Sequence, residues 1–213
     1  MGRNDSGLWA MIHQARRSLA ADLDTLSEED WHRQTLCSGW TVEEVVAHLT
    51  AGASIGRWRW LASILAARFR PEIHNQRRLL EHLGPTPQDT RRRFGLVIDA
   101  EVAPTGDTAA YLGEVMVHGE DIRRPLGIAA AADVQAWTAV AEFYARRDFT
   151  VASRTLSAGL RLEADDGPFR AGAGPVVTGT TRALVMAMAG RPDYLAELHG
   201  PGLDLLRTRI LTS

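Results

Sequence analysis

A glutamate and a histidine one helical turn apart, Glu114 and His118, are the residues of this chain best suited to do chemistry. Tyr111, Val115, His118 and Ile122 recur at spacings of four, three and four, which predicts a helix with these positions on its buried face. Glu114 lies on the same face, because residues three and four apart on a helix are neighbours. A buried carboxylate is costly unless it is paired, hydrogen-bonded or bound to a metal.

Two kinds of chemistry suit this pair. The simpler interpretation of the pair alone is a Glu–His hydrogen bond that satisfies both groups in a helical core. The other is a zinc-type metal site, for which a histidine and a carboxylate at i, i+4 are suitable ligands. A metal needs a third protein ligand, and His48 is the best-placed candidate because it follows the apolar Val45 by three residues. Three protein ligands leave the fourth position open, as in catalytic zinc sites.

The elements that must position these residues are predicted to be helices of a bundle. The first has a stripe of apolar residues at spacings of three and four, namely Leu8, Ile12, Ala15, Leu19, Leu23 and Leu26. A second helix, which carries His48, begins at Thr41, where Thr41 and Glu44 have the spacing of a capping box. Residues 58–83 are predicted to be helical with a break near Pro71.

Further helices follow along the chain. Thr86 and Pro87 suit the N-cap and first position of a helix, and Gly127 suits the end of the helix that carries Glu114. Asp133 is predicted to cap the next helix, which runs through Trp137 and Tyr144.

The pattern changes after Phe149. Residues 159–163 alternate like a strand, residues 175–178 read as further strand, and 180–189 form an apolar helix. The fold class is therefore predicted to be mainly α with a small α/β domain. We expect a helical bundle with the metal site at residues 1–150 and a small α/β domain at residues 151–213.

The composition of the chain excludes several classes of protein. Hydrophobic residues make up 45% of the 213, which supports a real core, and a formal net charge of −2 argues against a nucleic-acid partner. The single cysteine, Cys37, excludes an intramolecular disulfide and any multi-cysteine metal site. No signal-peptide pattern and no run of about 18 apolar residues is present, so we expect a soluble cytoplasmic protein without membrane partners.

Several segments resemble the mycothiol-dependent maleylpyruvate isomerase family, within the DinB-like superfamily. They are CSGWTVEEVVAHL at 37–49, EVMVHGEDIRRPLG at 114–127 and, in the C-terminal part, GLRLEADDG, GPVVTGTTRALVMAMAGR and LHGPGLDLL. The resemblance implies a DinB-like four-helix bundle with a divalent metal, usually zinc, and a C-terminal α/β domain that helps to close the active site. It also implies mycothiol as thiol cosubstrate, and it matches His48, Glu114 and His118 to the family's metal ligands.

Three arginines are candidates for binding or catalysis. The resemblance implies that an arginine of the C-terminal domain takes part in activity, and Arg191 is our candidate for that catalytic role. Arg123 and Arg124 are our candidates for binding the cosubstrate or a carboxylate-bearing substrate. The alternative for all three is a structural cation near a helix C-terminus.

The sequence leaves two alternatives open for each of two further residues, Cys37, four residues before Thr41, and Asp121, seven residues after Glu114. Cys37 is either a reactive thiol or a small buried side chain. Asp121 is either a hydrogen-bond partner of a metal ligand or a surface carboxylate.

The sequence thus predicts a metal-dependent, mycothiol-using isomerase or S-transferase that acts on a small electrophilic substrate through a metal-bound thiolate. The alternatives are a metal-dependent hydrolase, in which water takes the open metal position, and a non-enzymatic metal- or ligand-binding protein of the same fold. The expected partners are a small-molecule substrate and a low-molecular-weight thiol, and the protein is expected to be a monomer or homodimer.

Overall fold

The computed structural model describes residues 3–54, 79–103, 106–130 and 133–212. Most of the helix predicted for residues 58–83 lies outside this part of the chain. The chain divides into two compact units, Met1–Ala130 and Ala131–Ser213.

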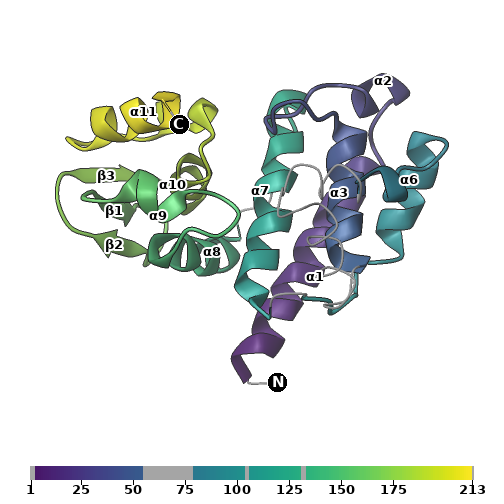
Figure 1. The fold of residues 1–213 in the computed structure, drawn as a ribbon, viewed down its shortest axis with the longest axis horizontal. Coiled ribbons are helices and arrows are strands. Elements are labelled where there is room, and N and C mark those ends of the chain that lie inside the picture. The colour runs from purple at the N-terminus through teal and green to yellow at the C-terminus, as the bar shows by residue number, and fades with distance from the viewer. Residues whose placement is uncertain (1–2, 55–78, 104–105, 131–132, 213) are drawn as a thin grey trace, which may run out of the picture. The chain divides into compact units, whose positions relative to one another are not determined.

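The N-terminal unit is built from helices that pack side by side (Figure 1). Its elements are α1 (Arg3–Leu23), the short α2 (Glu28–Trp31), α3 (Val42–Ser54), α6 (Pro87–Gly95) and α7 (Thr108–Leu126). Helix α7 packs against both α1 and α3, and α6 contacts α1 and α3 in turn. The four longer helices therefore enclose one core.

Apolar residues on one face of each helix form that core. They include Ile12 and Leu19 of α1, Val45 and Val46 of α3, Phe94 of α6, and Leu112 and Ile122 of α7, all fully buried. Burying one such side chain contributes about 1.5–3 kcal/mol, so the apolar periodicity of the sequence carries most of the bundle's stability.

The predicted helix ends are formed as the sequence indicates. Thr41 Oγ1 accepts a hydrogen bond from the Glu44 N–H (3.4 Å), and Glu44 Oε2 accepts one from the Thr41 N–H (2.8 Å), which completes the capping box of α3. Thr86 caps α6, with Pro87 at its first position. Gly127 ends α7 with φ of 69°, a left-handed conformation that favours glycine.

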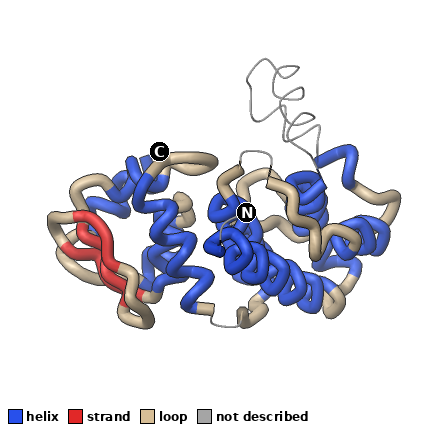
Figure 2. The backbone as a smooth tube through the Cα atoms, turned by 90° about the horizontal axis from the view of Figure 1, so that it is seen from below, coloured by secondary structure: helices blue, strands red, loops and turns tan. Residues whose placement is uncertain are grey.

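The C-terminal unit is a small α/β arrangement (Figure 2). Its elements are α8 (Val134–Arg146), α9 (Ser153–Ser157), β1 (Arg161–Ala164), β2 (Arg170–Gly172), β3 (Val176–Gly179), α10 (Thr181–Met188), the 3-10 helix η1 (Pro192–Glu197) and α11 (Leu203–Thr212). The strand order is β2-β1-β3, with β1 antiparallel to β2 and parallel to β3. Helix α10 contacts β1, β3 and α8.

The position of α10 explains its unusually apolar sequence. Every residue from Ala183 to Ala189 is buried, so this helix has no solvent-facing side in that stretch. A helix that is hydrophobic all round belongs in a core. Strands β1 and β3 and helix α10 lie where the sequence predicts them, and the predicted class, mainly α with a small α/β part, is confirmed.

Helix α8 belongs to the C-terminal unit, although the sequence-based boundary at residues 150 and 151 assigns it to the bundle. Its buried Trp137, Val140 and Tyr144 belong to a helix that packs against α9, α10 and β2. The compact units accordingly divide near residue 130.

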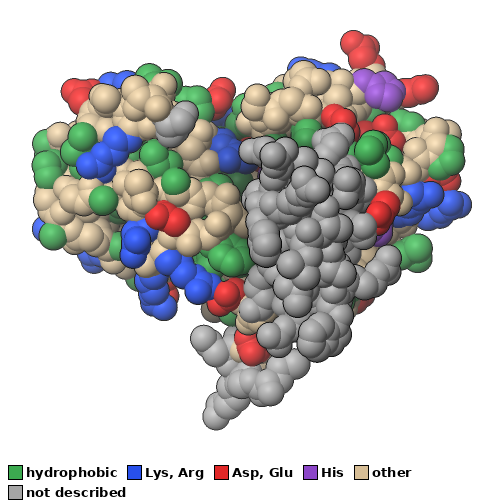
Figure 3. Space-filling model, in the orientation of Figure 1, with side chains coloured by type: hydrophobic (Ala, Val, Ile, Leu, Met, Phe, Trp, Pro, Cys, Tyr) green, Lys and Arg blue, Asp and Glu red, His purple; other side chains and the backbone are tan. Residues whose placement is uncertain are grey.

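On the face drawn in Figure 3, the C-terminal unit carries both acidic and basic side chains. Among the helices of the described residues, none is long and apolar enough to cross a lipid bilayer.

Candidate metal centre

Two helices of the N-terminal unit supply the three predicted ligands. His48 lies in the second turn of α3, after the capping box at Thr41, and Glu114 and His118 lie one turn apart on α7. Helices α3 and α7 pack directly against each other, which brings the three side chains together.

The donor atoms converge on one carboxylate oxygen. His48 Nε2 lies 3.2 Å and His118 Nε2 lies 3.5 Å from the same atom, Glu114 Oε2. The two imidazole rings meet edge to face, with centroids 5.1 Å apart and an interplanar angle of 79°. The side chains are mostly buried, with exposed fractions of 16% for His48, 24% for Glu114 and 12% for His118.

Two of the three donor separations in this cluster are compatible with a zinc site. With metal–ligand bonds of about 2.0–2.1 Å and tetrahedral angles, two nitrogen or oxygen ligands of one zinc ion lie about 3.3 Å apart. The two distances of 3.2 and 3.5 Å to Glu114 Oε2 fall on either side of that value. Two imidazoles and one carboxylate are also a borderline-hard donor set that suits zinc and similar divalent ions.

Hydrogen bonds and charge decide the protonation of the cluster. Burial by itself would raise the pKa of Glu114, but hydrogen bonds from His118 and His48 and the charges of both rings hold this pKa well below its usual value. Burial would likewise lower the pKa of His118, but hydrogen bonds with Asp121, Cys37 and Glu114 and the charge of Glu114 raise it well above its usual value. The interactions among Glu114, His48 and His118 thus favour the charged carboxylate, and those around His118 favour the charged ring.

The loop before α3 forms one wall of the site. The Trp40 ring lies 4.8 Å from the His48 ring and 6.2 Å from the His118 ring, measured between centroids. The loop is joined to α7 by a hydrogen bond from the Leu36 N–H to the Asp121 carbonyl oxygen (3.1 Å). Trp40 thus presents apolar surface beside both histidines.

Asp121 lies behind His118. Its side chain is 0% exposed, and its Oδ2 atom lies 3.0 Å from His118 Nδ1. A carboxylate on the second ring nitrogen fixes the orientation of a histidine and leaves Nε2 to face a metal. Of the two roles that the sequence left open for Asp121, its burial excludes a surface carboxylate.

The three arginines lie in different surroundings. Arg123 is buried, and its guanidinium donates to Asp22 Oδ2 (2.7 Å) and Ser18 Oγ (3.3 Å), which joins α7 to α1. Arg124 is exposed near the end of α7. Arg191 belongs to the C-terminal unit and donates from Nη1 to the Ala189 carbonyl oxygen (2.6 Å). Their roles in catalysis and binding stay predictions.

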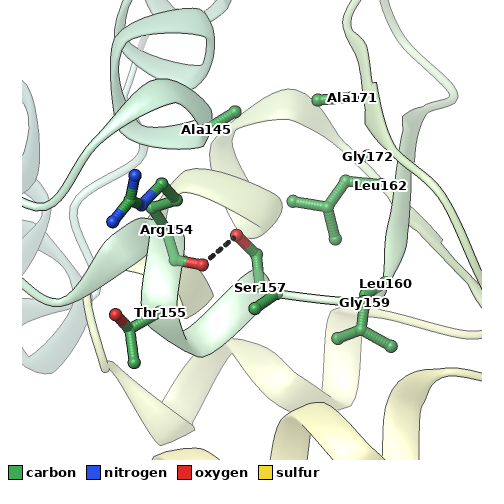
Figure 4. Close-up of a pocket in the computed structure, with 10 residues that line it drawn as sticks. Ala145, Arg154, Thr155, Ser157, Gly159, Leu160, Leu162, Ala171 and Gly172 are labelled. Carbon is green, nitrogen blue, oxygen red and sulfur yellow. Dashed lines mark hydrogen bonds between the residues drawn. The ribbon is translucent and has the colours of Figure 1, made fainter.

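A separate cavity of about 390 Å³ lies in the C-terminal unit, between α9 and the sheet (Figure 4). Its lining is mainly apolar, with Leu160, Leu162 and Ala171 beside Ser157, whose hydroxyl donates to the Arg154 carbonyl oxygen (3.3 Å). The lining residues include one charged side chain, Arg154, and no histidine or carboxylate. The cavity therefore lacks the groups for metal or acid–base chemistry that the His48–Glu114–His118 cluster has.

The sequence patterns did not predict that the loop before α3 forms part of the site. Helical periodicity relates residues a few positions apart, whereas Cys37 and Trp40 reach His118 only because the loop folds back onto α7. The three-residue spacing of His118 and Asp121 was the one local signal for their contact.

Comparisons with known proteins agree with this architecture. The family model described as the mycothiol maleylpyruvate isomerase N-terminal domain matches residues 12–190. Two solved structures, of the mycothiol-dependent maleylpyruvate isomerase and of a histidine-to-alanine mutant of it, each match with a TM-score of 0.63, 16% identity and 92% of both chains covered. No curated protein matches the chain in sequence. The structural likeness confirms the DinB-like fold, and because the family model covers most of its length, this chain belongs to the mycothiol maleylpyruvate isomerase N-terminal domain family.

Proposed function

We propose that this protein is a metal-dependent enzyme that uses mycothiol to isomerise a small electrophilic substrate of the maleylpyruvate type. The observation that carries the proposal is the convergence of His48 Nε2 and His118 Nε2 on Glu114 Oε2. Membership of the family and the names of the two solved relatives support mycothiol as the thiol and isomerisation as the reaction.

In this proposal His48, Glu114 and His118 hold a divalent ion, and zinc is the metal that their donor set suits best. Such an ion, when bound, stabilises a thiolate over a thiol at neutral pH. Asp121 holds the His118 ring in place through Nδ1, at 3.0 Å. Trp40 beside the two rings excludes water from one side of the site.

The proposed reaction needs no net oxidation. The sulfur of mycothiol adds to one carbon of a cis double bond conjugated to a carbonyl group, and the second carbon becomes part of an enolate. The former double bond is then single and rotates, and loss of the thiolate restores the double bond in the trans form. A substrate of this type carries carboxylates, for which Arg191 and Arg124 are the proposed binding groups.

The test is an assay of maleylpyruvate with the zinc-loaded protein, with and without mycothiol. We expect conversion to the trans isomer only when mycothiol is present, with no net consumption of the thiol. A stable adduct between mycothiol and the substrate would identify an S-transferase. Hydrolysis of the substrate in the absence of thiol would identify a hydrolase. Failure to bind mycothiol or turn over any substrate would contradict the proposal and favour a binding protein.

A second measurement tests the role of the thiol. Calorimetric titration of the zinc-loaded protein with mycothiol in two buffers of different ionisation enthalpy should report proton release, because the thiol binds as thiolate. Binding without proton release would contradict the thiolate step. The His48→Ala variant should lose this binding, whereas His199→Ala, at an exposed histidine of the C-terminal unit, should keep it.

A further inference from the structure

His118 belongs to two groups of metal-binding side chains. Its Nε2 atom faces Glu114 and the group His48–Glu114–His118, whereas its Nδ1 atom lies 3.0 Å from Asp121 Oδ2. In the second group, one donor atom each from Cys37, His118 and Asp121 lies within 4.8 Å of the others. Two sets of three donors thus meet at one imidazole ring.

The second group is held in position by the backbone around it. Asp121 is fully buried and sits three residues after His118 on α7. Thr35 Oγ1 accepts a hydrogen bond from the Cys37 N–H (3.1 Å). The Leu36 N–H donates to the Asp121 carbonyl oxygen (3.1 Å), so the cysteine loop is attached to the helix at the same residue that supplies the carboxylate.

The donor set of this group differs from that of the first. A thiol, an imidazole and a carboxylate are common zinc ligands, and the sulfur adds a preference for thiophilic ions over magnesium or manganese. The 3.0 Å separation of His118 Nδ1 and Asp121 Oδ2 is close to the ligand separation of about 3.3 Å around zinc. An ion bound here would replace the proton shared between these two atoms.

We propose that Cys37, His118 and Asp121 form a second metal site that takes a thiophilic divalent ion such as zinc or cadmium. A neutral imidazole has one nitrogen with a free lone pair, because the other carries the proton. His118 can therefore serve one of the two groups at a time as a neutral ligand, and the two sites compete. An ion at Cys37 removes His118 from the first site, and this holds whether or not the protein uses a thiol cosubstrate.

The experiment is a cadmium titration of the full-length protein, followed by the ultraviolet charge-transfer absorption of a cadmium–thiolate bond. Cys37 is the only cysteine of the chain, so this band reports that residue alone. We expect the band to saturate at about one cadmium ion per chain. If zinc is loaded beforehand, a chelating dye should detect about one zinc ion released for each cadmium–thiolate bond formed.

Variants separate this site from its alternatives. Glu114→Gln, which disables the first group, should keep the cadmium–thiolate band, whereas Cys37→Ser should lose it. Asp121→Asn should weaken cadmium binding about tenfold or more, while Asp204→Asn, at an exposed residue of α11, should leave it unchanged. Circular dichroism of each variant establishes that it is folded.

Three results would overturn the second metal site, and a fourth would overturn its competition with the first. The first is absence of the band in the unmodified protein. The second is its loss in Glu114→Gln, which would assign Cys37 to the first site. The third is an unchanged cadmium affinity in folded Asp121→Asn. This result would mean that cadmium binds to Cys37 without Asp121 as a ligand and that Asp121 only orients His118. Zinc retained in full at saturating cadmium would overturn the competition between the sites.

Discussion

At the scale of single residues, His118 is the side chain on which the whole site depends. It contacts Glu114 through Nε2 and Asp121 through Nδ1, and it also hydrogen-bonds Cys37. A carboxylate therefore lies beside each ring nitrogen, Glu114 at Nε2 and Asp121 at Nδ1. A charged ring is stable there only while these partners are present, because an unpaired buried charge is costly.

Trp40 offers a test of how strongly the wall of the site positions the ligands. Trp40→Ala removes the ring that lies 4.8 Å from His48 but leaves all three donor groups. We expect zinc affinity to fall about tenfold, because groups around the ligands fix their orientation and limit the access of water. Competition with a chelating dye measures this affinity. Trp40→Phe, which keeps an aromatic ring, should stay near the unmodified value, and equal affinity in Trp40→Ala would show that the wall has no such role.

The spacing of residues predicted one part of the site and could not predict the rest. Glu114 and His118 are one turn apart on a helix, so their proximity follows from the sequence alone. His48 joins them through the packing of α3 on α7, for which the sequence offered only an apolar stripe. The approach of Cys37 depends on a loop held by Thr35 and Leu36, and no periodic pattern encodes such a contact.

At the scale of elements, the start of α3 fixes where His48 lies. The Thr41–Glu44 capping box satisfies two N–H groups at that end of the helix. Thr41→Ala should lower the free energy of unfolding by about 1 kcal/mol, because one of these groups loses its acceptor. Urea denaturation measures the change. Thr212→Ala, at an exposed threonine near the end of α11, is the control, and equal effects of both substitutions would contradict a capping role.

Asp148 contributes to the stability of the segment before β1, and this contribution depends on pH. Its carboxylate accepts hydrogen bonds from the Thr155 hydroxyl (2.6 Å) and N–H (3.0 Å), and these bonds lower the pKa of Asp148 below its usual 3.8. Because the folded pKa lies below the unfolded one, the stabilisation is present above the unfolded pKa and is lost as pH falls through the folded pKa.

The check is to compare urea denaturation of the unmodified protein and Asp148→Asn across pH. The unmodified protein should be more stable in neutral buffer, and the difference should shrink steadily toward acid. A difference that is the same at every pH would mean that the charge of Asp148 contributes nothing.

Helix α2 shows why short elements escape sequence patterns. Its four residues contain too few positions to display a helical period, and its capping box pairs Ser27 with Asp30, whereas the usual partner is Glu or Gln. Longer elements have enough residues to show a periodic or continuous apolar pattern. The buried helix α10, for example, was predicted within one or two residues at each end.

At the scale of the whole molecule, the chain has two compact units, and all three predicted ligands of the first site belong to one of them. The sequence predicted two parts but put their boundary after α8. The apolar stripe of an amphipathic helix predicts that the helix packs against a hydrophobic core. The stripe does not identify which of two cores that is. Which unit α8 joins depends on its contacts with α9 and α10.

Hydrogen exchange with and without zinc tests this division. Zinc at a hundredfold excess over its dissociation constant stabilises the unit that binds it by about 2.7 kcal/mol. Amides of α3 and α7 should therefore exchange more slowly, and those of β1 and β3 should change little. If zinc slowed exchange equally in both units, the two units would unfold together. Zinc binding would then stabilise the whole chain and not the N-terminal unit alone.

The most direct test of the central claim is the zinc content of Cys37→Ser protein, in which the second site is disabled and only the His48–Glu114–His118 group remains. Measured by elemental analysis after dialysis, this protein should hold about one zinc ion per chain. Adding His48→Ala or Glu114→Gln should reduce the content to near zero, whereas adding His199→Ala should not change it. Full zinc content in folded protein that lacks His48 or Glu114 would contradict the proposed metal centre.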